Sequence, residues 1–232
     1  MIIHFTNEFG RLNSILSSRS FWLSYCGEYF GDRTGKVISR AAHPMVSFSD
    51  YGDDELPKKQ VTYGGYGLAL NKSWALENGL SPVNYVEKNS PAAQGLICLL
   101  KARQRGSLPS SLRLPVMQLK CFTKHVYGFN SNFGEENFDF KAENEWRFVP
   151  SISQIGGNRI SENFSSYDKD REKYNKRLRQ YPLKFEFSDI KFIYVQTEEE
   201  RAKVVSEFVG LQGHKVKLSS WKQKQNSPLR ND

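Results

Sequence analysis

The first eighteen residues, MIIHFTNEFGRLNSILSS, constrain the fold most, because a strand-like apolar segment is followed at once by a helical one. The first part is rich in strand-forming residues, and Thr6 or Asn7 can cap a helix. Apolar residues then recur at helical spacing, at Phe9, Leu12, Ile15 and Leu16. The chain therefore opens with a strand, a turn and a helix, and His4 lies near the end of the strand. A histidine at that position either binds a ligand or has a purely structural role, and the structural role is the commoner of the two.

The composition favours one main domain. The chain has 232 residues, and its 16 Phe, 11 Tyr and 4 Trp are enough to fill a core. No apolar run is long enough to span a membrane and the N-terminus lacks the features of a signal peptide, so we expect a cytoplasmic protein without a membrane partner. The cysteines Cys26, Cys98 and Cys121 are scattered and odd in number, which favours neither a disulfide framework nor a metal site.

The basic residues are unevenly distributed. The net charge is +8, and residues 101–124 carry six Lys or Arg and no acid. Such asymmetry favours an anionic partner, of which nucleic acid is the first candidate. The alternatives are a solvated basic surface and a surface that binds an acidic protein. Aromatic neighbours favour single strands. The candidate nucleic-acid contacts are Lys101, Arg103, Arg105, Arg171, Lys176 and Arg177.

Local patterns predict the remaining elements. We expect strands at 44–49, 66–70, 83–86, 116–127, 143–150 and 190–196, and helices at 73–78, 91–104, 168–182 and 198–210. Thr197 and Glu200 form a capping-box pattern for the last helix. Loops are expected over 50–59, 105–115 and 151–167. Residues 1–210 are expected to form the domain, followed by a basic and flexible tail over 211–232.

The stretch YGGYGLAL, residues 63–70, is a candidate binding turn. Its glycines allow positive φ angles and a close approach of a ligand to the backbone, while Tyr63 and Tyr66 offer flat faces for stacking. The alternative is a tight turn whose tyrosines only pack. The spacing is that of neither a P-loop nor a dinucleotide fingerprint.

Glu143 and Glu145 alternate in ENEWRF, residues 143–148, so in a strand both carboxylates would project from one face. One of them could accept a proton or stabilise a developing cation. The alternative is pairing with nearby bases such as Arg147 or Lys141, and spacing alone favours it.

Four segments together carry a resemblance: IIHFTNEFGRLNSIL, PMVSFSDYG, YGGYGLALNKSWALENGLSPVNYV and ENEWRF. They resemble the AbiGi-type abortive-infection family of bacterial phage-defence proteins, over most of residues 1–150. That family in turn resembles ADP-ribosyltransferases of the histidine–tyrosine–glutamate type. The resemblance implies an α+β fold with a split antiparallel β core and flanking helices.

The resemblance also implies the roles of single residues. His4 and Thr6 would meet the ribose and carboxamide of NAD, and Tyr63 or Tyr66 would contact the nicotinamide. Glu145 would be the catalytic acid, with Glu143 as the alternative. Ser47 of PMVSFSDYG also belongs to the expected NAD site. Phe5 stands where a glycine is usual between the histidine and the threonine.

The expected function is that of an anti-phage toxin, which transfers ADP-ribose from NAD to a macromolecule, most readily RNA or DNA. Such an enzyme needs no metal, and its toxicity implies a restraining antitoxin or chaperone partner. The alternative is a catalytically inactive antitoxin or nucleic-acid-binding module of an abortive-infection system.

Overall fold

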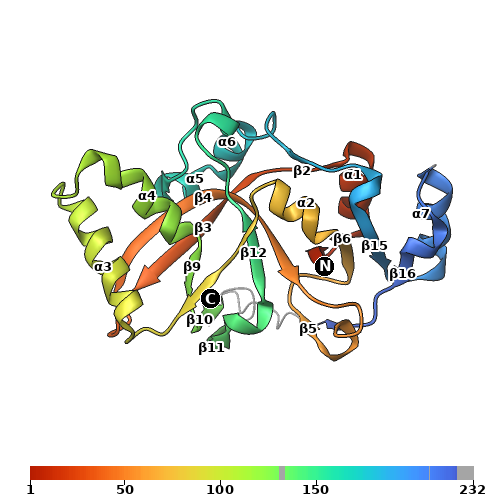
Figure 1. Cartoon of the computed structure of the whole chain (residues 1–232), viewed down its shortest axis with the longest axis horizontal. Helices are drawn as coiled ribbons and strands as arrows, with labels where there is room; N and C mark the ends of the chain where they lie inside the picture. Colours follow the sequence, from red (N-terminus) through yellow and green to blue (C-terminus); the bar gives the residue numbers. More distant parts are fainter. Residues whose placement is uncertain (131–133, 209, 224–232) are drawn as a thin grey trace.

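A nine-stranded mixed sheet runs through the α+β fold of the computed structural model, which describes residues 1–130, 134–208 and 210–223 (Figure 1). The strand order is β16 (Val216–Leu218), β15 (Ile190–Val195), β6 (Tyr66–Leu70), β1 (Ile2–Thr6), β4 (Val37–Asp50), β12 (Glu145–Phe148) and β7 (Ser81–Pro82), while β3 (Ser24–Gly31) and β13 (Glu162–Asn163) also pair with β4. All neighbours are antiparallel except β15 and β16. The sheet is therefore mostly antiparallel, and its likeness to an ADP-ribosyltransferase core stays an expectation.

The opening of the chain folds as predicted, into β1 and then α1 (Phe9–Ser18). β1 lies between β4 and β6, so its alternating side chains enter two cores. Ile2 packs into the larger core with Leu12 and Leu16 of α1, whereas Ile3 and Phe5 pack into a smaller one. The helix cap differs from the prediction, because the N-cap residue is Glu8 and its side chain makes no capping hydrogen bond.

β4 is far longer than the strand expected at 44–49, and its partner β3 was not expected at all. The first half of β4 contains Ser39, Ala41 and Ala42, which carry little strand propensity of their own. Packing stabilises this hairpin instead. Gly27 of β3, for example, lies directly under Phe164, where a Cβ atom would meet the ring at 2.3 Å.

The next helices agree with the sequence in part. α2 (Lys72–Glu77), β8 (Asn84–Val86) and α3 (Pro91–Gln104) lie where expected. The loop expected at 105–115 and the strand expected at 116–127 are wrong in large part, since α4 (Ser110–Cys121) occupies about half of each and contains Pro115. Its buried residues Val116, Met117, Lys120 and Cys121 follow a helical period. Only the short β9 (Thr123–His125) follows, in parallel with β8.

A hairpin of β10 (Tyr127–Asn130) and β11 (Glu135–Asp139) precedes β12 and was not expected. A 3₁₀ helix, η2 (Phe140–Glu143), joins this hairpin to β12. The strand predicted at 143–150 therefore begins only at Glu145. Asn144 interrupts it with a left-handed φ of 43°.

The segment expected as a loop at 151–167 contains β13 and the start of α5 (Phe164–Lys169). The single helix expected at 168–182 is also wrong. Asp170 ends α5 with a φ of −153°, and its side chain accepts a hydrogen bond from Lys173 N to cap α6 (Arg171–Lys176). β14 (Leu183–Lys184) follows and pairs with β2 (Ser20–Phe21).

β15 and α7 (Glu198–Glu207) confirm the predicted strand and helix, and the capping box between Thr197 and Glu200 is present. The tail expected over 211–232 differs in its described part. β16 joins the main sheet, and β17 (Lys222–Gln223) pairs with β5 (Gln60–Val61). Residues 224–232 lie outside the described residues.

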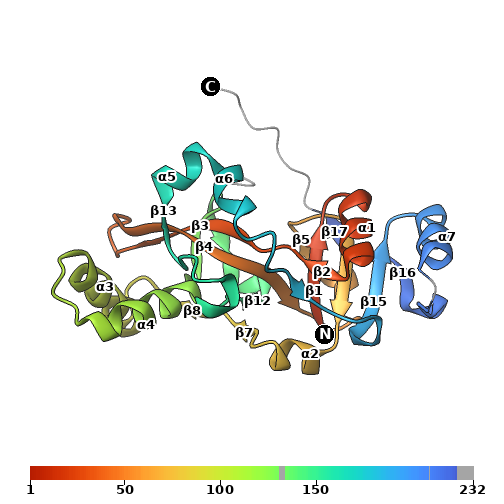
Figure 2. The same cartoon turned by 90° about the horizontal axis from the view of Figure 1, so that it is seen from above.

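Figure 2 shows α3 and α4 at one end of the molecule and α7 with β16 at the other. In the described part of the chain, the helices are all too short or too polar to cross a membrane.

Candidate functional site

A cavity of about 1040 Å³ lies beside the carboxyl end of β1. His4 and Thr6 line it from β1, and Tyr63 and Gly64 line it from the loop before β6. Three of the residues expected to bind NAD thus share one cavity. We call it the His4 cavity. Its volume is at the upper end of the range found for small-molecule sites.

The geometry of His4 fixes which nitrogen carries the proton. Nδ1 lies 2.9 Å from the carbonyl oxygen of Ser47, which can only accept, so Nδ1 donates and Nε2 is left as an acceptor. Phe21 and Phe48 pack edge-on against the ring. Burial lowers the pKa of His4 more than the hydrogen bond to Ser47 raises it. His4 is therefore a neutral imidazole that can accept a hydrogen bond from a hydroxyl.

Gly64 brings the loop of Tyr63 against the end of β1. Its φ is 124°, and a Cβ atom there would lie 2.2 Å from the carbonyl oxygen of Thr6. Its own carbonyl oxygen accepts a hydrogen bond of 3.0 Å from the indole of Trp221. The glycine is needed for a close approach between two segments of this chain, and not for the approach of a ligand as the sequence suggested.

The structure separates the two candidate tyrosines. Tyr63 is 41% exposed on the wall of the His4 cavity, and its hydroxyl donates a 2.8 Å hydrogen bond to Glu143 Oε1. Tyr66 is buried, and its hydroxyl donates to Glu200 of α7. Of the two, Tyr63 is the one placed to contact a ligand.

Glu145 is held by four hydrogen bonds, which use the capacity of an ionised carboxylate. Oε1 accepts from Ser47 Oγ at 2.8 Å and from Arg147 Nε at 2.8 Å. Oε2 accepts from Arg147 Nη2 at 3.0 Å and from Lys124 Nζ at 3.2 Å. Burial alone would raise the pKa of Glu145, but the charges of Arg147 and Lys124 outweigh it and hold the pKa below its usual range.

Glu143 has more freedom than Glu145. Oε1 accepts from Tyr63, and Oε2 accepts from Lys124 Nζ at 3.1 Å. No other described residue donates to its two remaining acceptor positions. Burial raises the pKa of Glu143 more than the charge of Lys124 lowers it. Glu143 also lines a small pocket of about 30 Å³, whose other walls include Tyr63.

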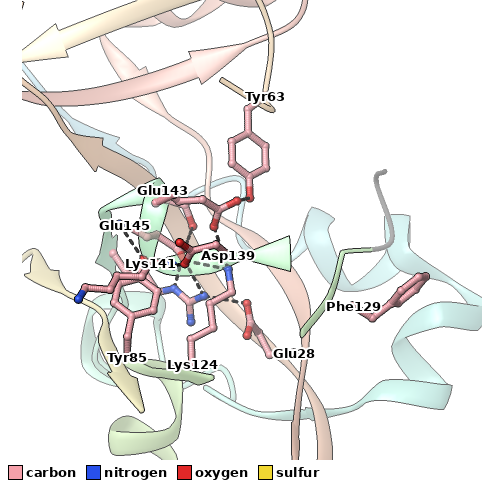
Figure 3. A network of polar contacts seen from close by, with 12 residues as sticks. Glu28, Tyr63, Tyr85, Lys124, Phe129, Asp139, Lys141, Glu143 and Glu145 are labelled. Carbon is pink, nitrogen blue, oxygen red and sulfur yellow. Dashed lines mark hydrogen bonds and ion pairs between the residues drawn. The ribbon is translucent and has the colours of Figure 1, made fainter. Parts of the chain in front are cut away.

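These groups form one buried network, drawn in Figure 3, which we call the carboxylate cluster: Glu28, Lys124, Glu143, Glu145 and Arg147. Arg147 Nη2 joins Glu28 of β3 at 2.9 Å, and Arg147 Nη1 donates to the carbonyl oxygen of Cys121. Three acids face two bases, so the cluster carries one net negative charge when all five are ionised. Such a site suits a cationic group or a developing positive charge.

Glu143 and Glu145 lie close together as the sequence predicted, but they do not alternate along one strand. Only Glu145 lies on β12, and Lys124 joins it to Glu143 of η2. Glu145 faces the side of the sheet occupied by Ile3, because both pair with Ser49. His4 faces the other side, against Phe48. The His4 cavity and the carboxylate cluster therefore adjoin at Tyr63, and neither Glu143 nor Glu145 lines the cavity itself.

The sequence missed several members of this site. Lys124 was assigned only to a basic run, and Glu28 and Tyr85 were not considered. Tyr85 Oη accepts a 2.9 Å hydrogen bond from the backbone N–H of Glu145. Ser47, which was expected in the NAD site, connects the two groups of residues, as its backbone contacts His4 and its side chain contacts Glu145. The sequence gave one signal for the ion pair of Arg147 and Glu145, which is that the two residues alternate in ENEWRF.

The candidate nucleic-acid contacts are spread over two regions. Lys101, Arg103 and Arg105 lie at the end of α3, and the others lie on or beside α6, where Arg171 pairs with Asp168 and Arg177 pairs with Glu162; Lys176 ends α6. Two further bases of the acid-free run point inward, Lys120 fully buried and Lys124 mostly so. Lys120 lies 2.9 Å from His43 Nε2, and Lys124 belongs to the carboxylate cluster.

Over 1–130, 134–208 and 210–223, no three His, Cys, Asp or Glu side chains converge on a position that could hold a metal ion.

The fold and site define a class of protein: an α+β domain with a nucleotide-sized cavity beside a buried carboxylate cluster. The chain belongs to the AbiGi family of abortive phage resistance proteins, because residues 19–196 match the family model described as "Putative abortive phage resistance protein AbiGi, antitoxin". It is also similar to the abortive phage resistance protein AbiGi of Lactococcus lactis subsp. cremoris. The two are 25% identical over 194 residues, which cover 70% of this chain and 75% of that protein. No solved structure matches the chain. These comparisons place the chain in phage defence and assign no reaction to it.

Proposed function

We propose that the chain acts in phage defence as an NAD-dependent ADP-ribosyltransferase. The observation that supports this best is the arrangement around Tyr63. Its ring lines the cavity that His4 and Thr6 share, and its hydroxyl is bound to Glu143. Residues from three distant segments, expected to act together on NAD, adjoin here.

In this proposal NAD lies in the His4 cavity with its nicotinamide against Tyr63. His4 Nε2 accepts a hydrogen bond from a ribose hydroxyl, since Nδ1–H is already committed to Ser47. Ordered contacts of this kind fix the sugar for reaction. Thr6, at the end of β1, lies on the same wall.

Breaking the bond between nicotinamide and ribose develops positive charge on the sugar, and a fixed carboxylate lowers the energy of that transition state. Of the two acids, Glu143 is hydrogen-bonded to Tyr63 on the wall of the His4 cavity, and it is not saturated by the described residues. We therefore assign to Glu143 the electrostatic stabilisation of the positive charge on the sugar. Glu145 is saturated by Ser47, Arg147 and Lys124. Its role is to position Lys124, which in turn orients Glu143.

The acceptor of ADP-ribose is a nucleic acid in this proposal, on the ground of the basic residues at the end of α3. The choice of nucleic acid as the acceptor depends on the charge of these residues alone. Efficient labelling of protein and not of RNA or DNA would replace nucleic acid by a protein acceptor.

A second candidate function is that of an antitoxin, which binds and neutralises a toxin of the same defence system. Two observations favour it: the family description includes the word antitoxin, and Glu145 has no acceptor position left for a substrate. A protein of this kind would need no turnover of NAD.

One experiment separates the two functions. The purified chain is incubated with NAD labelled in the nicotinamide or in the adenylate, with total RNA, DNA and protein as acceptors. The transferase proposal predicts nicotinamide release and transfer of label to nucleic acid. Absence of nicotinamide release with every acceptor would contradict it and leave the antitoxin function.

A further inference from the structure

Trp22 differs from the other three tryptophans of the chain. Trp74, Trp146 and Trp221 are 4%, 7% and 7% exposed, whereas Trp22 is 59% exposed. The indoles of Trp74 and Trp221 donate hydrogen bonds to carbonyl oxygens, and Lys72 lies over the ring of Trp146. Among the described residues, the Trp22 ring has neither a hydrogen bond nor an aromatic or cationic partner. Its open face is available for stacking on a planar ring of a ligand.

The position of Trp22 is set by its neighbours. Phe21 and Leu23 are buried in the core, whereas Trp22 between them is exposed. All three residues line the His4 cavity. Trp22 directly follows β2, a short strand paired with β14, and lies in the two-residue connection to β3.

Two arginines line the same cavity. Arg11 comes from α1, and Arg179 follows α6. Each pairs with an exposed carboxylate: Arg11 with Glu8 at 3.5 Å, and Arg179 with Glu172. Exposed pairs of this kind contribute little stability, so a phosphate can displace the carboxylates at low cost. Guanidinium groups bind phosphates through paired hydrogen bonds.

We propose that this part of the cavity holds the adenosine diphosphate half of a dinucleotide. The adenine stacks on Trp22, and the two phosphates bind Arg11 and Arg179. This inference rests on the proposed function, because the nicotinamide half would lie near His4 and Tyr63 in the same cavity. The residues proposed to hold the two halves line one continuous cavity, which favours a dinucleotide over two separate ligands.

The test measures binding of ADP-ribose by calorimetry. Stacking of a base on an aromatic side chain contributes enough that Trp22→Ala should weaken binding about tenfold. Trp22→Phe should keep most of the affinity, and Phe129→Ala, which removes an exposed ring outside the cavity, should keep all of it. Arg11→Gln and Arg179→Gln should weaken ADP-ribose and leave adenosine unchanged. Equal affinity in the wild type and Trp22→Ala would overturn the inference.

A second readout uses the wild-type chain. Acrylamide should quench mainly Trp22, and ADP-ribose or NAD should protect it from quenching. Protection by a single-stranded oligonucleotide but not by ADP-ribose would overturn the inference in favour of a nucleic-acid contact.

Nicotinamide release is measured beside these assays, so that the two proposals can fail separately. Release without protection of Trp22 contradicts the adenylate site and leaves the transferase function. Protection of Trp22 by ADP-ribose without any release supports the nucleotide site and contradicts the transferase function.

Discussion

Arg147 holds Glu145 through two hydrogen bonds within a single strand, from Nε to Oε1 at 2.8 Å and from Nη2 to Oε2 at 3.0 Å. The two residues alternate along β12 and so share one face of the sheet. The pair keeps Glu145 ionised and fixes its direction.

The first prediction concerns this pair. Arg147→Met should lower the free energy of unfolding by about 3–5 kcal/mol, because Glu145 and Glu28 lose a buried counter-charge. Arg147→Lys should not restore it, since an ammonium cannot form the paired bonds. Urea unfolding provides the measurement. Arg171→Met, which breaks an exposed pair with Asp168, is the control and should cost at most about 1 kcal/mol. Equal stabilities for the two methionine variants would show that the buried pair contributes nothing special.

The two tyrosines give a second prediction. Tyr63→Ala should raise the KM for NAD about tenfold, because a stacking face is lost. Tyr66→Phe should leave that KM unchanged and cost about 1 kcal/mol of stability through its lost bond to Glu200. Initial rates of nicotinamide release and urea unfolding test the two parts. The reverse pattern, with Tyr66 controlling KM, would refute the placement of NAD against Tyr63.

A third prediction concerns the basic end of α3. Replacing Lys101, Arg103 and Arg105 together by Ala should weaken labelling of single-stranded RNA or DNA and leave nicotinamide release intact. The binding constant for a single strand falls as the salt concentration rises. Each lost phosphate contact should make the slope of log K against log salt less steep by about 0.7. A matched variant replaces the exposed Lys58, Lys88 and Lys184 by Ala and should behave as wild type. Unchanged labelling by the first variant at every salt concentration would exclude this surface as the acceptor track.

The buried pair of His43 and Lys120 leads to a prediction on pH. His43 Nδ1 donates to the carbonyl oxygen of Ile160, and Nε2 accepts from Lys120. Burial, and then the charge of Lys120, lower the pKa of His43 to about 3. Below pH 6.5 the unfolded chain binds a proton that the folded chain excludes, so the free energy of unfolding should fall as the pH falls towards 3.

His43→Gln should remove this contribution, which has a limiting slope of about 1.4 kcal/mol per pH unit. Urea unfolding at pH 7, 6 and 5 gives the difference in slope between wild type and variant. His4, whose pKa is also lowered by burial, is present in both proteins and cancels. Parallel stability curves would contradict a neutral His43 in the fold.

Local sequence patterns predicted those elements whose residues carry their own signal. β1 with α1, β15 and α7 with its capping box are of this kind. The first half of β4 was missed because its serines and alanines become a strand only through pairing with β3 and packing around His43. α4 was missed because Pro109 and Pro115 indicated a loop, although its buried residues follow a helical period.

The site shows the same division. The sequence singled out Glu143, Glu145, Ser47 and Tyr63, which the structure brings close together, but it placed both acids on one strand. Asn144 breaks that strand, and Lys124, which is distant in sequence, brings the acids together. A basic residue in an acid-free run gives no sign that it will be buried between two carboxylates. The same long-range packing decides that Trp22 stays open on the cavity wall.

The central claim is that Glu143, beside Tyr63, acts on NAD. The most direct measurement is the rate of nicotinamide release by Glu143→Gln, with the exposed Glu136 of β11 providing a matched control, Glu136→Gln. Loss of one electrostatic group from an active site typically lowers the rate by about 10²-fold or more, and we predict this for Glu143→Gln with its stability retained. We predict wild-type rates for Glu136→Gln. A folded Glu143→Gln variant that releases nicotinamide at the wild-type rate would contradict the account.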